Sequence, residues 1–363
     1  VLPAMSRWGI LHRSATWATP AMSLPIQTMS YTIDVYRGDA RAQRSILNFG
    51  TFVTLFPQLI AGPIIKYKDL GDQIDQRDCT VDKFASGVQM FMIGLGKKLL
   101  IANNVGMLWD SYKTMALADL TVAGAWLGVL AFTFQIYFDF SGYSDMAVGL
   151  GRMLGFEFMR NFNYPYISRS ITEFWRRWHI SLSTWFRDYV YFPMGGSRCG
   201  KGKMVFNLVV VWLLTGLWHG EGVNFLLWGA ILGLLIIMEK LWYGKYLQKL
   251  PVLGHIYLVI LIPLSWVVFA ITDPGQLGTY FCRLFPLLGN GGVAVNAQDI
   301  VKYLQGYGGL LAIGIVLCIP AVFDFYEKHK KNPVVILMLF VLFWISIYFV
   351  SSTAGNPFMY LNF

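Results

Sequence analysis

Long blocks of apolar residues, separated by short polar links, constrain the fold of this chain more than any other feature. Of its 363 residues, 56% are hydrophobic and only 13% are charged, whereas a soluble domain carries about 25% charged residues. A helix that crosses a membrane needs ~20 mostly apolar residues. Blocks near that length cover residues 46–62, 85–107, 120–138, 204–218, 222–238, 252–271, 309–323 and 333–350. The pattern predicts an all-α, multi-pass membrane protein.

Several of these blocks are interrupted. Pro57 and Pro63 fall in or beside the first block, and Lys97 and Lys98 fall inside the second. Broken segments are tolerated at membrane depth only where the backbone is buried in protein or lines a cavity. We therefore expect short, tilted and re-entrant helices in place of a simple row of parallel helices.

The formal net charge of +9 raises the question of nucleic-acid binding. In this chain the Lys and Arg residues lie between apolar blocks, which is typical of the cytoplasmic loops of membrane proteins. The charge therefore indicates contact with the lipid bilayer and not with nucleic acid.

The distribution of basic residues also predicts the topology. The links 240–249 and 326–332 are short and basic, so both should be cytoplasmic, whereas the link 272–308 has few basic residues and should face outward. This assignment places the region around His179 on the cytoplasmic side. It places the corner Trp218-His219-Gly220 towards the outer half of the membrane.

Common catalytic and metal-binding motifs do not occur in the sequence. There is no GxxxxGK[ST], GxSxG or HExxH segment. The four cysteines form no CxxC pair and have no histidine at ligand spacing, so small buried hydrophobic residues are the expectation and a metal site is not. The four are Cys79, Cys199, Cys282 and Cys318.

The segment ITEFWRRWHISLSTWFRDYVYF, residues 171–192, has the apolar spacing of one amphipathic helix. A basic face opposite an aromatic face predicts a helix that lies in the bilayer interface. The apolar face would carry Trp175, Trp178, His179, Leu182 and Phe186. The opposite face would carry Arg176, Ser183 and Arg187.

His219, which ends the block VVVWLLTGLWHG, is one of two histidines that stand out among the five. An ionisable residue at membrane depth indicates a functional site, and a dry site keeps an imidazole neutral, as a general base requires. A structural histidine bonded to a neighbouring helix is an equally good interpretation of the spacing. His179, taken alone, fits an interfacial histidine better than a catalyst.

Two carboxylates, Asp139 and Asp145, lie in the segment QIYFDFSGYSD beside an apolar block. They could be acid/base groups. Helix capping, or pairing with Arg152, is at least as good an interpretation.

The order and specificity of several segments resemble the membrane-bound O-acyltransferase (MBOAT) family, in its bacterial branch of alginate O-acetyltransferases and teichoic-acid D-alanyltransferases. The tail segment SWVVFAITDPGQLGTYFCRLF favours the alginate-type side of that branch. The resembling blocks are QTMSYTIDVYRG, FPQLIAGPI, GLGKKLLIANN, QIYFDFSGYSDMAVGLGRMLGF, NFNYPYISRSITEFWRRWHISLSTWFRDYVYFPMGGSR and LLTGLWHG.

The resemblance implies a ring of membrane helices with a thin centre, in the bacterial cytoplasmic membrane, where a cytoplasmic acyl donor meets an outer acceptor. The donor would be acetyl-CoA or another acyl thioester, with no bound cofactor, and the acceptor a polysaccharide hydroxyl or a partner acetyltransferase. His219 matches the family's catalytic histidine and His179 its second position, which would position the donor or polarise its carbonyl. Donor or substrate contacts would come from Trp178, Arg177, Trp218, Asp139 and Asp145.

Two other functions remain open at this point. The same fold transfers D-alanine to teichoic acid in related proteins, and a non-catalytic transporter or scaffold of a polymer-acetylation system would keep the same helices. Residues 1–25 have no long apolar run and match neither a signal peptide nor a first membrane helix. We expect one MBOAT-like domain over 26–363, without the family's N-terminal helices.

Overall fold

The computed structural model describes residues 18–59, 62–116, 119–288 and 297–352, and every regular element within these ranges is a helix. The predicted all-α membrane fold is therefore confirmed. Residues 1–17 of the start that the sequence marks as unusual lie outside the described residues, and the rest of that start begins the first helix.

The helices follow one another with short links. They are α1 (Ala18–Arg37), α2 (Ile46–Thr54), α3 (Phe56–Leu59), α4 (Tyr67–Asp75), α5 (Val81–Gly96), α6 (Asn103–Lys113), α7 (Val122–Met153), α8 (Ile171–Arg177), α9 (Ile180–Phe186), α10 (Lys201–His219), α11 (Val223–Met238), α12 (Gly244–Lys249), α13 (Pro251–Ala270), α14 (Pro274–Leu284), α15 (Ala297–Leu317), α16 (Pro320–His329) and α17 (Pro333–Ser352). Three π-helical segments join or extend them, namely Lys97–Ala102, Arg187–Tyr191 and Glu239–Tyr243.

Seven helical stretches among the described residues are long and apolar enough to cross a membrane. They are Val81–Lys113, Val122–Met153, Lys201–His219, Val223–Lys249, Pro251–Ala270, Ile300–Leu317 and Pro333–Ser351. The first apolar block of the sequence, 46–62, forms the two short helices α2 and α3 instead. The chain breaks between them at Leu55, close to Pro57, whose ring disfavours a continuous helix.

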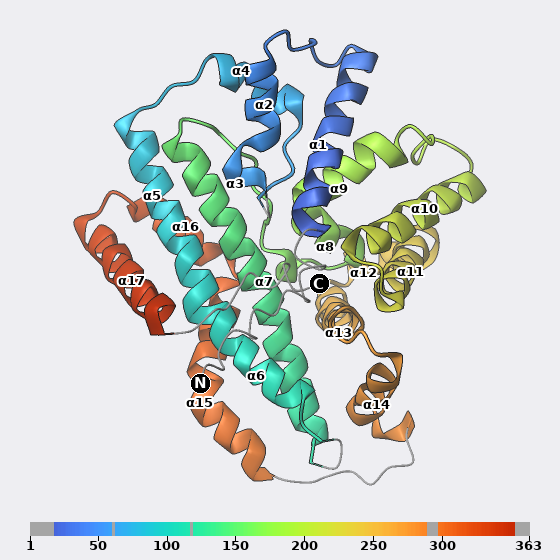
Figure 1. The fold of residues 1–363 in the computed structure, drawn as a ribbon. Coiled ribbons are helices and arrows are strands. Elements are labelled where there is room, and N and C mark those ends of the chain that lie inside the picture. The colour runs from blue at the N-terminus through green and yellow to red at the C-terminus, as the bar shows by residue number, and fades with distance from the viewer. Residues whose placement is uncertain (1–17, 60–61, 117–118, 289–296, 353–363) are drawn as a thin grey trace, which may run out of the picture.

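The arrangement centres on α7 (Figure 1). The continuous stretch of α5, the π-helical segment Lys97–Ala102 and α6 lies along α7, with α17 outside it. The hairpin of α10 and α11 and the helix α13 lie on the opposite flank of α7, and α1 to α4 gather at one end of the molecule. The central position of α7 agrees with its sequence, in which apolar residues occur on all sides.

Glycines allow α5 and α7 to pack backbone against backbone. A Cβ atom on Gly87 would lie 2.6 Å from the carbonyl oxygen of Gly149, and one on Gly149 equally close to that of Gly87. Seven residues along, a Cβ on Gly142 would lie 2.7 Å from the oxygen of Gly94. Small residues at helix interfaces replace the missing hydrophobic force between helices in a membrane by close van der Waals contact. These two contacts therefore fix the register of α5 on α7.

Two lysines of the π-helical segment pair with the two carboxylates of α7. Lys98 bonds Asp139, with side chains 9% and 2% exposed, and Lys97 bonds Asp145 at 2.6 Å. The lysine pair, which interrupts an apolar block of the sequence, lies within the continuous helix and ties it to α7.

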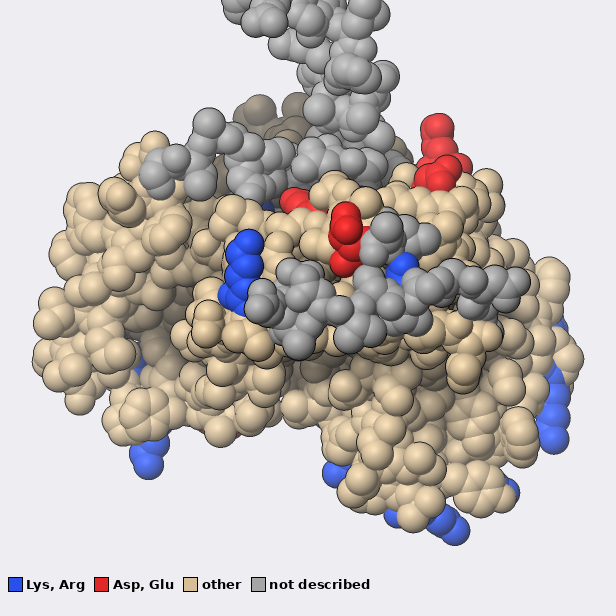
Figure 2. Space-filling view, turned by 90° about the horizontal axis from the view of Figure 1, so that it is seen from below, with Lys and Arg blue, Asp and Glu red and all other residues tan. Residues whose placement is uncertain are grey.

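Polar contacts at the two ends of the bundle agree with the charge-based topology. At one end Lys113 Nζ donates to the carbonyl of Ala270, and Trp126 Nε1 to that of Leu284. At the other end Gln89 donates to the carbonyl of Lys330. The link that starts at residue 272 and the basic link 326–332 therefore lie at opposite ends. The first of these ends shows few, scattered Lys and Arg residues (Figure 2).

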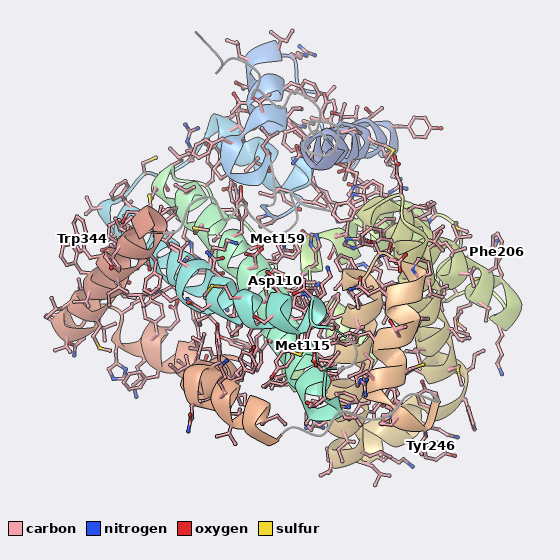
Figure 3. All side chains as sticks on the ribbon, turned by 60° about the horizontal axis from the view of Figure 1, so that its bottom comes forward. Asp110, Met115, Met159, Phe206, Tyr246 and Trp344 are labelled. Carbon is pink, nitrogen blue, oxygen red and sulfur yellow. The ribbon has the colours of Figure 1, made fainter. Side chains whose placement is uncertain are left out.

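Large apolar side chains point away from the bundle. Phe206 on α10, Tyr246 on α12 and Trp344 on α17 are at least 49% exposed and project outward (Figure 3). Exposed aromatic and aliphatic residues on this scale are a liability in water and are normal on a surface that contacts lipid.

Asp139→Asn should destabilise the protein by about 3–5 kcal/mol, because it leaves the buried ammonium of Lys98 without its counter-charge. Asp145→Asn is the matched control, since that pair is about one-fifth exposed, and should cost only about 1 kcal/mol. The double change Lys98→Met/Asp139→Leu should restore much of the loss. Unfolding free energies in detergent would measure all three, and equal losses for the two single variants would contradict this assignment.

Candidate active site

The helix that carries His179 is broken at that residue. α8 ends at Arg177, α9 begins at Ile180, and His179 between them has φ 44° and ψ 56°. The single helix predicted for 171–192 is therefore wrong. A left-handed conformation is uncommon for a residue other than glycine and persists only where neighbouring contacts impose it.

The predicted faces of this segment are nevertheless correct. All five residues of its apolar face are buried, whereas Arg176 and Arg187 are exposed. The break redirects the chain without exchanging its two faces.

Trp178 lies in an aromatic core and not beside a ligand cavity. Its ring stacks on Phe174 at 5.4 Å, meets Trp266 at 4.9 Å, and is 1% exposed. This side chain therefore belongs to the aromatic packing and is not among the residues that line the cavity described below.

A buried carboxylate holds the start of α8. Glu239, in the π-helical segment after α11, accepts hydrogen bonds from the backbone N–H groups of Ile171 at 2.6 Å and Thr172 at 2.9 Å. These groups have no partner within the helix, and a negative charge at a helix N-terminus is stabilising. Glu239 therefore sets the position of α8 and of the bend that follows it.

His179 is enclosed by protein. Its imidazole is 3% exposed, meets Phe140 edge-on at 4.7 Å, and has its Nδ1 atom 3.2 Å from Oδ1 of Asn161. Burial lowers the pKa of His179 well below its ordinary value, and the nearby His219 lowers it further. The ring is therefore neutral at physiological pH.

His219 is the last residue of α10 and is surrounded by aromatic rings. The ring centroids of Trp218, Trp228 and Phe269 lie 4.8, 5.0 and 5.3 Å from its own, all nearly perpendicular. The hairpin brings it there because α10 and α11 touch at Gly216, where a Cβ would lie 2.6 Å from the carbonyl oxygen of Phe225. Three elements, α10, α11 and α13, thus define the position of this imidazole.

Trp218 connects the two histidines. Its ring centroid lies 4.8 Å from that of His219 and 5.9 Å from that of His179. Its indole Nε1–H is buried and has no hydrogen-bond partner among the described residues. The two histidines, 40 positions apart in the sequence, therefore flank one indole that has a hydrogen bond left to donate.

A cavity of about 620 Å³ opens next to His179. The exposed cations Arg176, Arg187 and Lys240 line it, and so do the buried side chains of Trp175 and Trp212. Exposed residues mark its mouth and buried ones its inner wall, so a ligand would meet positive charge first and an apolar wall with an imidazole further in.

The three cations at the mouth are residues that the sequence analysis did not propose for the site. Arg176 and Arg187 were recognisable there only as the polar face of a helix, and Lys240 only as part of a basic link. No pattern in the sequence brings these positions together, because their meeting depends on the packing of α8, α9 and α11.

Arg177, Asp139 and Asp145 lie elsewhere. Arg177 pairs with Glu173 at 3.0 Å and donates to the carbonyl of Asn163, and the two carboxylates bind lysines. None of the three lines the cavity. Of the seven residues proposed from the sequence, His179, His219 and Trp218 are the ones that come together.

The fold and the site together define a multi-pass helical membrane protein with two histidines that share a tryptophan neighbour, one of which, His179, is buried beside a cavity. The chain belongs to the membrane-bound O-acyltransferase family, MBOAT, whose family model matches residues 13–273.

Relatives agree with this membership. The probable alginate O-acetylase AlgI of Pseudomonas syringae is 50% identical over 312 residues, which are 84% of this chain and 58% of that protein. The protein of the same name in Pseudomonas putida is 39% identical over 93% of this chain and 73% of its own length. The peptidoglycan O-acetyltransferase of Helicobacter pylori is 31% identical over 87% of this chain and 64% of its own length. The chain spans little more than half of the length of the first of these relatives.

Glu239→Ala should destabilise the protein by about 1–3 kcal/mol, because two buried N–H groups at the start of α8 lose their acceptor. Glu239→Gln keeps one acceptor oxygen and should lose less. The control Glu173→Gln removes a partly exposed i,i+4 pair on the same helix and should cost about 0.3–0.5 kcal/mol. Thermal unfolding in detergent would compare them; a larger loss for the Glu173 variant would contradict the anchoring role.

Proposed function

We propose that this protein is a membrane O-acyltransferase that moves an acetyl group from a cytoplasmic thioester to a hydroxyl of a polysaccharide outside the bacterial cytoplasmic membrane. The observation that carries the proposal is that His179 and His219 both lie close to Trp218, and that His179 lines a cavity with a cationic mouth. Family membership supports the reaction class, and the names of the relatives support acetyl transfer to a polysaccharide.

The cavity suits a phosphorylated thioester such as acetyl-CoA. Its volume of about 620 Å³ lies within the ~300–1,000 Å³ of small-molecule sites. Arginine and lysine at the mouth would bind phosphate groups by charge-assisted hydrogen bonds. Because Lys240 begins a basic link that the charge pattern assigns to the cytoplasm, the donor would enter from that side.

His219 would act as general base and then as general acid. It would accept the proton of the acceptor hydroxyl while that oxygen attacks the thioester carbonyl carbon, and the C–S bond would then break as the thiolate takes the proton from His219. The products are the O-acyl ester and the free thiol, so all atoms and charges balance.

Trp218 would stabilise the transition state. Its side chain contacts both imidazoles. Its buried Nε1–H would donate a hydrogen bond to the developing oxyanion. The apolar surroundings of His219 would exclude water, which competes with the acceptor hydroxyl for the acyl group.

The acceptor would reach His219 from the outer side. The corner at His219 lies next to the C-terminal end of α13, where Asn224 donates a hydrogen bond to the carbonyl of Phe269. The link that follows α13 has few basic residues, and the charge pattern places it outside. An extracytoplasmic polysaccharide, or a partner acetyltransferase that passes the group on, would take the acyl group there.

His219→Ala should lower acyl transfer by about 10²–10⁴-fold, the usual contribution of a general base. His329→Ala is the matched control, because that exposed histidine bonds the backbone of its own helix, and should leave the rate unchanged. Polymer O-acetylation and acceptor-free thioester cleavage by the purified protein would both be measured. Full activity of His219→Ala would rule out this mechanism and favour a transporter or scaffold.

Arg176→Gln should raise the KM for acetyl-CoA by about 10-fold, the value of one charge-assisted hydrogen bond, with a smaller effect at high salt. Arg177→Gln is the control, because the adjacent arginine pairs with Glu173 and lies off the cavity. A short acetyl thioester without phosphates should show no difference between the two. A KM effect confined to Arg177→Gln would place the donor elsewhere.

A further inference from the structure

Asn161 occupies the inside of the bend at His179 and is 2% exposed. Its side-chain Oδ1 atom lies 3.1 Å from the backbone nitrogen of Ser181, 2.9 Å from Ser181 Oγ and 3.2 Å from His179 Nδ1. Its Nδ2 atom donates to Ser144 Oγ on α7 at 3.2 Å. One amide therefore joins the bend to the central helix of the molecule.

These contacts determine which way the amide of Asn161 faces. The backbone N–H of Ser181 can only donate, so the atom that it meets must be the oxygen of the amide. The other side of the amide then carries the NH₂ group, which has Ser144 Oγ as its acceptor. The orientation does not depend on any assumption about the histidine.

The proton on the His179 ring follows from that orientation. Nδ1 faces an acceptor oxygen, and two acceptors facing each other at 3.2 Å would repel, so Nδ1 must carry the hydrogen. The hydroxyl of Ser181 does not supply an alternative, because its one hydrogen goes to Asn161 at 2.9 Å and its distance to Nδ1 is 3.4 Å. In a neutral ring, Nε2 then has a free lone pair.

Asn161 also holds the backbone of the bend. Its own carbonyl accepts from the N–H of Ile180 at 2.9 Å, directly after the residue in the left-handed conformation. Both the direction of the His179 ring and its tautomer therefore depend on one residue that does not itself line the cavity.

We propose that Asn161 is a positioning residue that holds His179 as the Nδ1–H tautomer, so that Nε2 accepts a hydrogen bond from a donor group of the substrates during acyl transfer. This inference rests on the proposed function. It sharpens the role of His179, because a neutral ring with a bare Nε2 cannot donate to the thioester carbonyl. Stabilisation of the oxyanion is thereby left to Trp218.

The other charged groups around His179 are few. His219 on α10 acts on the ring electrostatically, and Arg176, Arg187 and Lys240 share the cavity wall with it. On the far side of Asn161, Lys97, Asp145 and Arg160 line a small space of about 40 Å³. None of these groups changes in the variants below, so a change in the pH profile would report the new contact at His179.

Asn161→Asp and Asn161→Leu test the proposal in the full chain. The aspartate keeps an acceptor for Nδ1 and adds a negative charge that favours the imidazolium. The acid limb of kcat/KM should therefore move up by about 1–3 pH units, and activity should be rescued at high pH. The leucine removes the acceptor and should lower kcat by about 10²–10⁴-fold, as loss of the correct tautomer does elsewhere. Asn163→Asp, at an exposed position two residues on, should leave the pH profile unchanged.

Nitrogen-15 NMR of histidine-labelled protein in lipid nanodiscs supplies a measurement that needs no activity and no variant at Asn161. The His179 signals, assigned by their loss in His179→Gln, should show a protonated Nδ1 and an unprotonated Nε2. A protonated Nε2, or an Asn161→Asp profile identical to that of the native protein, would overturn the proposal. Absence of acyl transfer together with the Nδ1–H tautomer would contradict the proposed function alone and leave the assignment of Asn161 standing.

Discussion

The hydrogen bonds that Asn161 makes inside the bend at His179 connect the site to the rest of the molecule. In a membrane, a backbone group that leaves a helix has no water to bond, so a helix break must find its partners in the protein. The carbonyl and the side chain of Asn161 supply them for Ile180 and Ser181. The same side chain is tied to α7 through Ser144. The position of the imidazole is therefore a consequence of how the break is stabilised.

Around that bend, the helices are held by contacts that tolerate little movement. Glycines place the backbones of α5 and α7 in contact, lysines of a π-helical segment bind carboxylates of α7, and Glu239 bonds the first N–H groups of α8. Packing and buried polar bonds replace the hydrophobic effect as the source of specificity, since lipid is as apolar as the helix surfaces. His179 lies beside two of these helices, because it contacts Phe140 of α7 and follows the end of α8.

The positive charges of the site and its two imidazoles lie in different surroundings. Positive charges lie at the exposed mouth of the cavity, where they would attract the proposed phosphorylated donor, whereas both imidazoles lie against aromatic rings. An arginine directly beside the imidazoles would also favour their neutral form, but its hydrated guanidinium group would place water next to the rings. The aromatic rings around His219 and Trp178 therefore pack the core and also leave less room for water beside the imidazoles.

The membrane class, the all-helical fold, the position of most spanning helices and the family could be predicted from the sequence, because apolar length and charge asymmetry are local properties and the motif blocks are long and specific. The sequence also indicated His179, His219 and Trp218 for the site, and the structure brings these three side chains together. Three features became visible only in the folded molecule. Residues 171–192 break at His179, Trp178 packs in the core while Arg177, Asp139 and Asp145 form ion pairs, and the cavity is lined by Arg176, Arg187 and Lys240. Helical periodicity describes each segment alone, whereas these outcomes depend on hydrogen bonds from Asn161 and Glu239, which lie 18 and 60 residues away from His179 along the chain.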